Sequence, residues 1–247
     1  MDGNVWASET IQVTAYAVIA YLGGLLVELK NVKVNYTRKI NFFALYVVPL
    51  ILGRLFPYEP TVLAIALRSV LGAGIFAVFL QPIRARVPVF QTMFSSFDRP
   101  EDRPHTLLWL STQILAGYAV LIPMSAVFAR YGISELMFIP VLIHGIGDGL
   151  AEPVGIRFGK HKYTTREFLS RARRHMRSYE GSACVFFSGI LAVSLFCQSF
   201  TPAQYAVALL TVPMLMTLAE AWSPHTWDTP YMFLTGSASL WAIKVWL

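Results

Sequence analysis

Two carboxylates, Asp148 and Glu152, stand among glycines at the end of an apolar stretch of the chain. An ionisable residue near membrane depth is costly unless it is paired, solvated or bound to a cation. If a helix continues to Pro153, the spacing of four residues places both carboxylates on one helix face, where they can share a divalent cation. Mg²⁺ suits oxygen ligands combined with phosphate, so this pattern predicts metal-assisted chemistry on a phosphate.

The residues after these acids have types that suit phosphate binding. Glycines leave room for a triphosphate to approach the backbone, and they stand at Gly155 and Gly159. Bases can hold the phosphate oxygens, and they stand at Arg157, Lys160 and Lys162. Arg177 and Ser182 can add donors at the next helix start, where unpaired N–H groups favour anions. The bases also fit an ordinary cytoplasmic loop, and the glycines also fit close helix packing.

The composition places these residues in a membrane protein. Of 247 residues, 55% are hydrophobic and 14% are charged, and the mean hydropathy is +0.54. Soluble globular domains rarely have this composition. We therefore predict an all-α polytopic membrane protein that forms a single integral membrane domain over residues 1 to 247. About eight transmembrane helices are expected, or seven, near residues 10 to 27, 40 to 56, 61 to 80, 107 to 128, 133 to 151, 183 to 200, 203 to 221 and 230 to 246.

The charges between these spans predict an orientation, because cytoplasmic loops carry an excess of Lys and Arg. Every second connection is basic, and the bases include Lys30, Lys33, Arg84, Arg86 and the residues from Arg157 to Arg177. We expect these loops in the cytoplasm and both termini on the opposite side. The same bias explains the net charge of +6, so there is no reason to expect a nucleic-acid partner.

In that orientation the unusual polar residues gather on the cytoplasmic side. They are Glu28, Arg38, Lys39, Asp148, Glu152, the run from Arg177 to Ser182, Glu220 and Asp228. Glu220 and Asp228 flank a turn and can point back toward the basic loop. The segment from Arg166 to Arg177 predicts an amphipathic interfacial helix against anionic membrane lipids. His144 is expected to be a packed or hydrogen-bonded histidine.

Several of these motifs resemble the signature of the polyprenol kinase family, which includes dolichol kinase, phytol kinase and the CTP-dependent diacylglycerol kinase of yeasts. The resemblance lies in Gly147-Asp148-Gly149-Leu150-Ala151, Gly155, Phe158-Gly159-Lys160 and the run from Arg177 to Ser182. It implies transfer of the terminal phosphate of a nucleotide triphosphate, with CTP preferred, to a membrane-embedded lipid alcohol. The expected substrate is an isoprenoid alcohol of the dolichol, phytol or farnesol type, and the expected cofactor is Mg²⁺.

Together, the residue types and the resemblance assign provisional roles. Asp148 and Glu152 would hold Mg²⁺, or one of them would accept the proton of the substrate hydroxyl. The nucleotide and its phosphates would contact Gly147, Gly149, Gly155, Arg157, Gly159, Lys160, Lys162, Arg177, Glu180, Gly181 and Ser182. Arg38 and Lys39 resemble the first basic motif of the family, and Glu220 through Asp228 resembles its last motif.

The chain departs from the family pattern at two positions. Phe42 stands where the family usually has histidine, and Thr229 stands where it usually has asparagine. These changes are consistent with an altered substrate or with lost activity. The second interpretation is a CTP:phosphatidate cytidylyltransferase, because the string from Phe158 to Lys162 also fits that family, whereas the residues around His225 do not. The third is a catalytically silent membrane subunit or lipid-binding protein.

Overall fold

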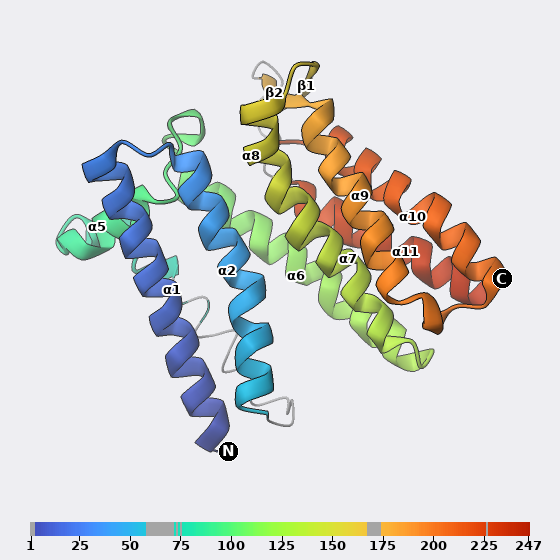
Figure 1. Cartoon of the computed structure of the whole chain (residues 1–247). Helices are drawn as coiled ribbons and strands as arrows, with labels where there is room; N and C mark the ends of the chain where they lie inside the picture. Colours follow the sequence, from blue (N-terminus) through green and yellow to red (C-terminus); the bar gives the residue numbers. More distant parts are fainter. Residues whose placement is uncertain (1–2, 58–71, 73, 75, 167–173, 226) are drawn as a thin grey trace. The chain divides into compact units, whose positions relative to one another are not determined.

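The computed structural model describes residues 3 to 57, 72, 74, 76 to 166, 174 to 225 and 227 to 247, and most of these residues are helical (Figure 1). They form two compact units, Met1–Trp109 and Leu110–Leu247. The expectation of a single membrane domain stays a prediction.

The first unit is built on a long N-terminal helix. It contains α1 (Gly3–Lys30), α2 (Val34–Leu55), α4 (Gln81–Arg84), α5 (Pro88–Ser95) and a short 3₁₀ turn, η1 (Pro100–Asp102). Helix α1 packs against both α2 and α5. The Thr37 hydroxyl donates to the Ser96 carbonyl at 2.9 Å, and the Asn41 amide donates to the Ser96 hydroxyl at 3.1 Å. Most of the span predicted at residues 61 to 80 lies outside the described residues.

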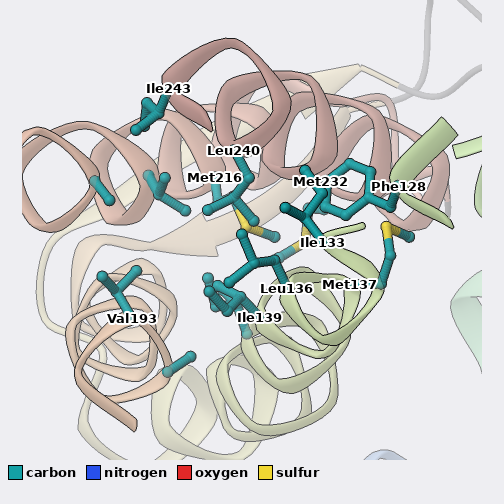
Figure 2. Close-up of a cluster of buried hydrophobic side chains, with 14 of the residues drawn as sticks. Phe128, Ile133, Leu136, Met137, Ile139, Val193, Met216, Met232, Leu240 and Ile243 are labelled. Carbon is teal, nitrogen blue, oxygen red and sulfur yellow. The ribbon is translucent and has the colours of Figure 1, made fainter. Parts of the chain in front are cut away.

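The second unit is a helical bundle with one hairpin. Its elements are α6 (Thr106–Arg130, which begins just before the unit), η2 (Ser134–Met137), α7 (Phe138–Leu142), η3 (Ile143–Asp148), α8 (Gly149–Phe158), β1 (Lys162–Arg166), β2 (Arg174–Ser178), α9 (Tyr179–Leu195), η4 (Cys197–Ser199), α10 (Pro202–Trp222) and α11 (Asp228–Trp246). Helix α9 packs against α8 and α10, and α10 packs against α11. Figure 2 shows the apolar core of this unit, which includes Leu136, Ile139, Met216, Met232 and Leu240.

Four helical stretches in the described part of the chain are long and apolar enough to cross a membrane. They are Val5–Lys30, Thr106–Arg130, Ser134–Phe158 and Pro202–Trp222. The structure is therefore helical, as predicted, and the length and apolar composition of these four stretches suggest a multi-pass membrane protein. Helices α2, α9 and α11 also lie where spans were predicted, but α2 carries Arg38, Lys39 and Arg54, and α9 has only 17 residues.

The interfacial helix predicted between Arg166 and Arg177 is wrong, because both ends of this segment are strands. β1 and β2 form an antiparallel hairpin that pairs Lys162 with Ser178 and Arg166 with Arg174. A helix would have stacked like charges one turn apart, for example Arg174 beside Arg177, which is unfavourable. Tyr163, Thr164 and Thr165 instead favour an extended backbone.

Three glycines lie where η3 and α8 approach the beginning of α9 closely. A Cβ on Gly147 would lie 2.7 Å from the Cα of Val185, and one on Gly181 would lie 2.6 Å from the Ala151 carbonyl oxygen. A Cβ on Gly155 would lie 2.8 Å from the Ser178 hydroxyl. The two backbone contacts leave no room for a side chain, and a Cβ on Gly155 would displace the Ser178 hydroxyl. Close packing of α8 against α9 therefore has direct geometric support, and phosphate binding by Gly155 and Gly159 stays a prediction.

We expect Gly147→Ala to destabilise the protein by about 1 to 3 kcal/mol, because the new methyl group must displace the α9 backbone. Gly53→Ala is the matched control, since a Cβ at Gly53 in α2 meets nothing within 4 Å. The alanine in a helix should be neutral or slightly stabilising there. Thermal unfolding of the purified proteins in detergent measures both changes. Equal melting temperatures for Gly147→Ala and wild type would contradict the packing described here.

Candidate functional site

A π-helical segment places the central carboxylate. The segment η3 covers Ile143–Asp148, and it buries both His144 and Asp148. Its backbone continues directly into α8, which runs past Pro153 to Phe158. The helix that was required to place Asp148 and Glu152 on one face is therefore present. π-Helical turns within α-helices are frequent at functional sites. Asp148 is 7% exposed, whereas Glu152 is half-buried.

Arg177 at the end of β2 is enclosed by two carboxylates from other elements. Its Nη1 lies 2.6 Å from Oε1 of Glu220, and its Nη2 lies 3.2 Å from Oδ2 of Asp228. Arg177 also donates to the backbone carbonyl of Glu220. The side chains are only 12%, 5% and 13% exposed for Arg177, Glu220 and Asp228. The expectation that Glu220 and Asp228 point toward the basic loop is thus confirmed.

A short chain of hydroxyl groups completes the surroundings of Glu220. The Ser182 hydroxyl donates to Oε2 of Glu220 at 2.9 Å, and the Tyr163 hydroxyl lies 2.6 Å from the Ser182 oxygen. Because Ser182 has a single proton to donate, Tyr163 must be the donor in their shared bond. Burial raises the pKa of Tyr163, and the negative charge of Glu220 raises it further. Tyr163 therefore stays protonated and able to donate.

A second branch of the network ties Asp228 to the helices. The Gln113 amide donates to Oδ1 of Asp228 at 3.0 Å and to the Thr229 hydroxyl at 2.6 Å. Nε2 of His144 lies 2.9 Å from the same hydroxyl. His144 is thus a hydrogen-bonded core histidine, as expected. Thr229, which departs from the family pattern, links α6, η3 and α11 through its hydroxyl.

The charges around Arg177 keep it ionised. Burial by itself opposes its charge, but the neighbouring Glu220 and Asp228 raise the pKa of Arg177 above its ordinary value. Asp148 contributes to the same effect. Three carboxylates from η3, α10 and α11 therefore act on one guanidinium. The predicted role of Arg177 as a phosphate ligand remains a prediction, because here its donors contact protein oxygens.

Glu180 anchors the loop between α8 and β1. Its carboxylate accepts hydrogen bonds from the backbone N–H groups of Lys160 at 3.1 Å and His161 at 3.2 Å. Its Oε1 also lies 2.9 Å from Nδ1 of His161. Its own backbone N–H, together with His161 and Lys160, lowers the pKa of Glu180 to about 2. In this structure the Glu180 carboxylate is hydrogen-bonded to the backbone N–H groups of Lys160 and His161, which a phosphate bound at this loop would otherwise use.

The remaining predicted residues divide into exposed bases and a pair in the other unit. Arg157, Lys160 and Lys162 are exposed on and after α8. Lys39 is buried in the first unit, with its ammonium 4.8 Å from the centre of the Phe42 ring. The structure does not place Arg38 and Lys39 relative to the carboxylates of the second unit.

The carboxylates of the site can be tested for a fit to Mg²⁺. Among the residues that the structure describes, no group of three or more His, Cys, Asp or Glu side chains could hold a metal ion. Mg²⁺ commonly binds through one or two carboxylates together with substrate phosphates and water. Asp148 and Glu152 stay the predicted pair of this kind, and both have the oxygen chemistry that Mg²⁺ requires.

Sequence reasoning missed two members of the network, Gln113 and Tyr163. Gln113 carried a usable signal, because an amide within a predicted membrane span needs hydrogen-bond partners. Tyr163 carried none, since its position depends on the hairpin. Comparisons with protein-family models, with curated proteins and with solved structures found no match for the chain.

Removing the charge of Glu220 should destabilise the second unit. We expect Glu220→Gln to cost about 3 kcal/mol, because Arg177 loses its nearest carboxylate while it remains largely buried. Arg103→Gln is the matched control, since Arg103 forms an ion pair with Asp98 but is 58% exposed. That exposed pair should contribute only about 0 to 1 kcal/mol. Chemical denaturation of the purified variants measures both values, and equal losses would refute the importance of burial.

The low pKa of Glu180 predicts a pH dependence. Its folded-state pKa is about 2, compared with about 4.3 for an unperturbed glutamate. The ionised carboxylate therefore stabilises the folded state above about pH 4.3, and this contribution is lost as the pH falls toward 2. The difference in melting temperature between wild type and Glu180→Gln should shrink over this interval. A difference that stays constant down to about pH 2 would show that the loop anchor does not depend on the charge.

Proposed function

We propose that this protein is a Mg²⁺-dependent kinase that transfers the terminal phosphate of a nucleotide, preferably CTP, to a lipid alcohol in the membrane. The observation that carries the proposal is the cluster of Asp148, Glu220 and Asp228 around Arg177. This cluster lies at the ends of apolar helices, beside a loop of exposed bases. Its charged groups are held in place before any substrate arrives.

The arrangement suits phosphoryl transfer because that reaction depends mainly on positioning and on stabilising charge. The exposed Lys160 and Lys162 provide positive charge that would contact the phosphates of the nucleotide. Asp148 and Glu152 would hold Mg²⁺, which when bound neutralises charge on the phosphate oxygens. Alternatively, one of the two carboxylates would accept the proton of the substrate hydroxyl.

A membrane-embedded substrate fits the outer surfaces of the helices. Leu115 and Ile122 on α6 are 67% and 62% exposed, and Leu210 on α10 is 73% exposed. Such surfaces suit lipid chains. We propose eight membrane-spanning helices in all, with the site on the cytoplasmic face and both termini on the opposite side, since the basic loops follow the positive-inside pattern. The lipid alcohol would enter sideways between helices, with its hydroxyl at the interface.

Isotope transfer tests the reaction directly. The purified protein is incubated in lipid nanodiscs with Mg²⁺, a panel of isoprenoid alcohols, diacylglycerol and phosphatidate, and CTP labelled either at the terminal or at the α phosphate. We expect terminal label in a phosphorylated alcohol and no transfer of α label. Transfer of CMP to phosphatidate would identify a cytidylyltransferase instead. Failure of the protein to bind any nucleotide would support a catalytically silent subunit.

Asp148→Asn should reduce the transfer by orders of magnitude while the protein remains folded, because the side chain keeps its shape but loses its charge for the metal. Glu135→Gln is the matched control, since Glu135 is an exposed acid in η2, away from Asp148 along the same helical stretch. Melting temperatures of both variants separate catalysis from folding. A wild-type rate in Asp148→Asn would remove this residue from the mechanism.

A further inference from the structure

The hairpin of β1 and β2 has two different faces. Its inward-facing pairs are Tyr163 with Arg177 and Thr165 with His175, and all four side chains are at least partly buried. Its opposite face carries Lys162, Thr164, Arg166, Arg174 and Met176, which are all exposed. Side chains alternate between the two faces of a strand, so this division follows from the register.

The inner face fixes the hairpin to the ends of α10 and α11. The ion pairs of Arg177 with Glu220 and Asp228 form one attachment. A second lies further along the hairpin, where the rings of His175 and His225 stack with their centres 3.6 Å apart and their planes 7° apart. The backbone N–H of His225 donates to the Arg166 carbonyl at 2.8 Å. The outer face is therefore held in a fixed orientation.

The outer face places two like charges directly opposite each other. Arg166 and Arg174 are cross-strand partners, and such a pair is destabilising unless an anion lies nearby. Neither guanidinium has an ion-pair partner within the described part of the chain. Met176, at the neighbouring position on the same face, is 63% exposed. Two bases beside a protruding apolar side chain are complementary to a membrane surface, where lipid phosphates lie next to the hydrocarbon chains.

The position of the hairpin indicates which anionic surface it meets. β1 begins only four residues after Phe158, where the candidate span Ser134–Phe158 ends. β2 is followed directly by the apolar helix α9. Phe158 and Tyr179 at these helix ends are 60% and 64% exposed, and exposed aromatic residues at helix ends are typical of the level of the lipid headgroups. Each strand is only about 16 Å long, so the hairpin remains near that level.

We infer that the outer face of the hairpin docks onto anionic lipid headgroups. Arg166 and Arg174 bind lipid phosphates together, and Met176 enters the interface between them and the hydrocarbon. Basic clusters directly beside membrane helices bind anionic lipids in this way. The inference goes beyond the proposed reaction and does not depend on it.

The test uses a fluorescent label on the outer face. An environment-sensitive dye is attached to Thr164→Cys in the full-length protein, in a background of Cys184→Ala and Cys197→Ala. The protein is reconstituted in nanodiscs of phosphatidylcholine with increasing phosphatidylserine. We expect a blue shift of the emission that saturates with phosphatidylserine and that high salt reverses. Replacing Arg166→Gln and Arg174→Gln should raise the half-saturating fraction about fivefold for each arginine.

Two further variants serve as controls. Arg166→Lys with Arg174→Lys keeps the charges and should keep most of the shift. Arg54→Gln with Arg130→Gln lowers the net charge equally at exposed positions outside the hairpin and should leave the shift unchanged. The inference is overturned if wild type shows no shift, or if the Gln pair in the hairpin responds like wild type. It is also overturned if inorganic phosphate produces the same shift in phosphatidylcholine nanodiscs, since the face would then bind soluble phosphate.

Discussion

The ion cluster of Arg177 with Glu220 and Asp228 is the interaction on which the second unit depends. A buried charge is costly, and the cost is met only where geometry and additional hydrogen bonds satisfy each partner. Here one oxygen of the Glu220 carboxylate accepts from Arg177, and the other accepts from the Ser182 hydroxyl. The Asp228 carboxylate accepts from Arg177 and from the Gln113 amide. The cluster therefore joins β2, α9, α10, α11 and α6 into one arrangement.

This arrangement explains why charged residues can lie at the end of an apolar bundle. The hairpin brings Arg177 to carboxylates that would otherwise repel one another, and the positive charge of Arg177 offsets that repulsion. Fixed charges of this kind need little rearrangement when a reaction develops new charge, which is the usual basis of electrostatic catalysis. The same groups thus stabilise the fold and prepare the proposed chemistry, so their variants must be assessed for both.

Part of the fold could be predicted from the sequence, because long apolar runs in a membrane protein can fold in few ways other than as helices. The runs that became α1, α6 and α10 predicted helices, and the spacing of Asp148 and Glu152 predicted the helix that continues past Pro153. The hairpin was not predicted, since its many arginines resemble an amphipathic helix until cross-strand pairing is known. The π-helical turn at Ile143–Asp148 also leaves no clear sequence signal. In the sequence, Gly155 is compatible with both close helix packing and phosphate binding. It is the short distance to the Ser178 hydroxyl in the structure that supports the packing role.

The most direct test of this account is hydrogen–deuterium exchange on Arg177→Met in nanodiscs. Methionine keeps much of the apolar length of arginine but removes its charge and its donors. If Arg177 fixes the hairpin to the bundle, backbone amides in Lys162–Arg166 and Arg174–Ser178 should exchange much faster than in wild type, while the central turns of α10 and α11 keep their protection. Unchanged exchange in both strands would show that the hairpin is held by other contacts and would contradict the central role of this ion cluster.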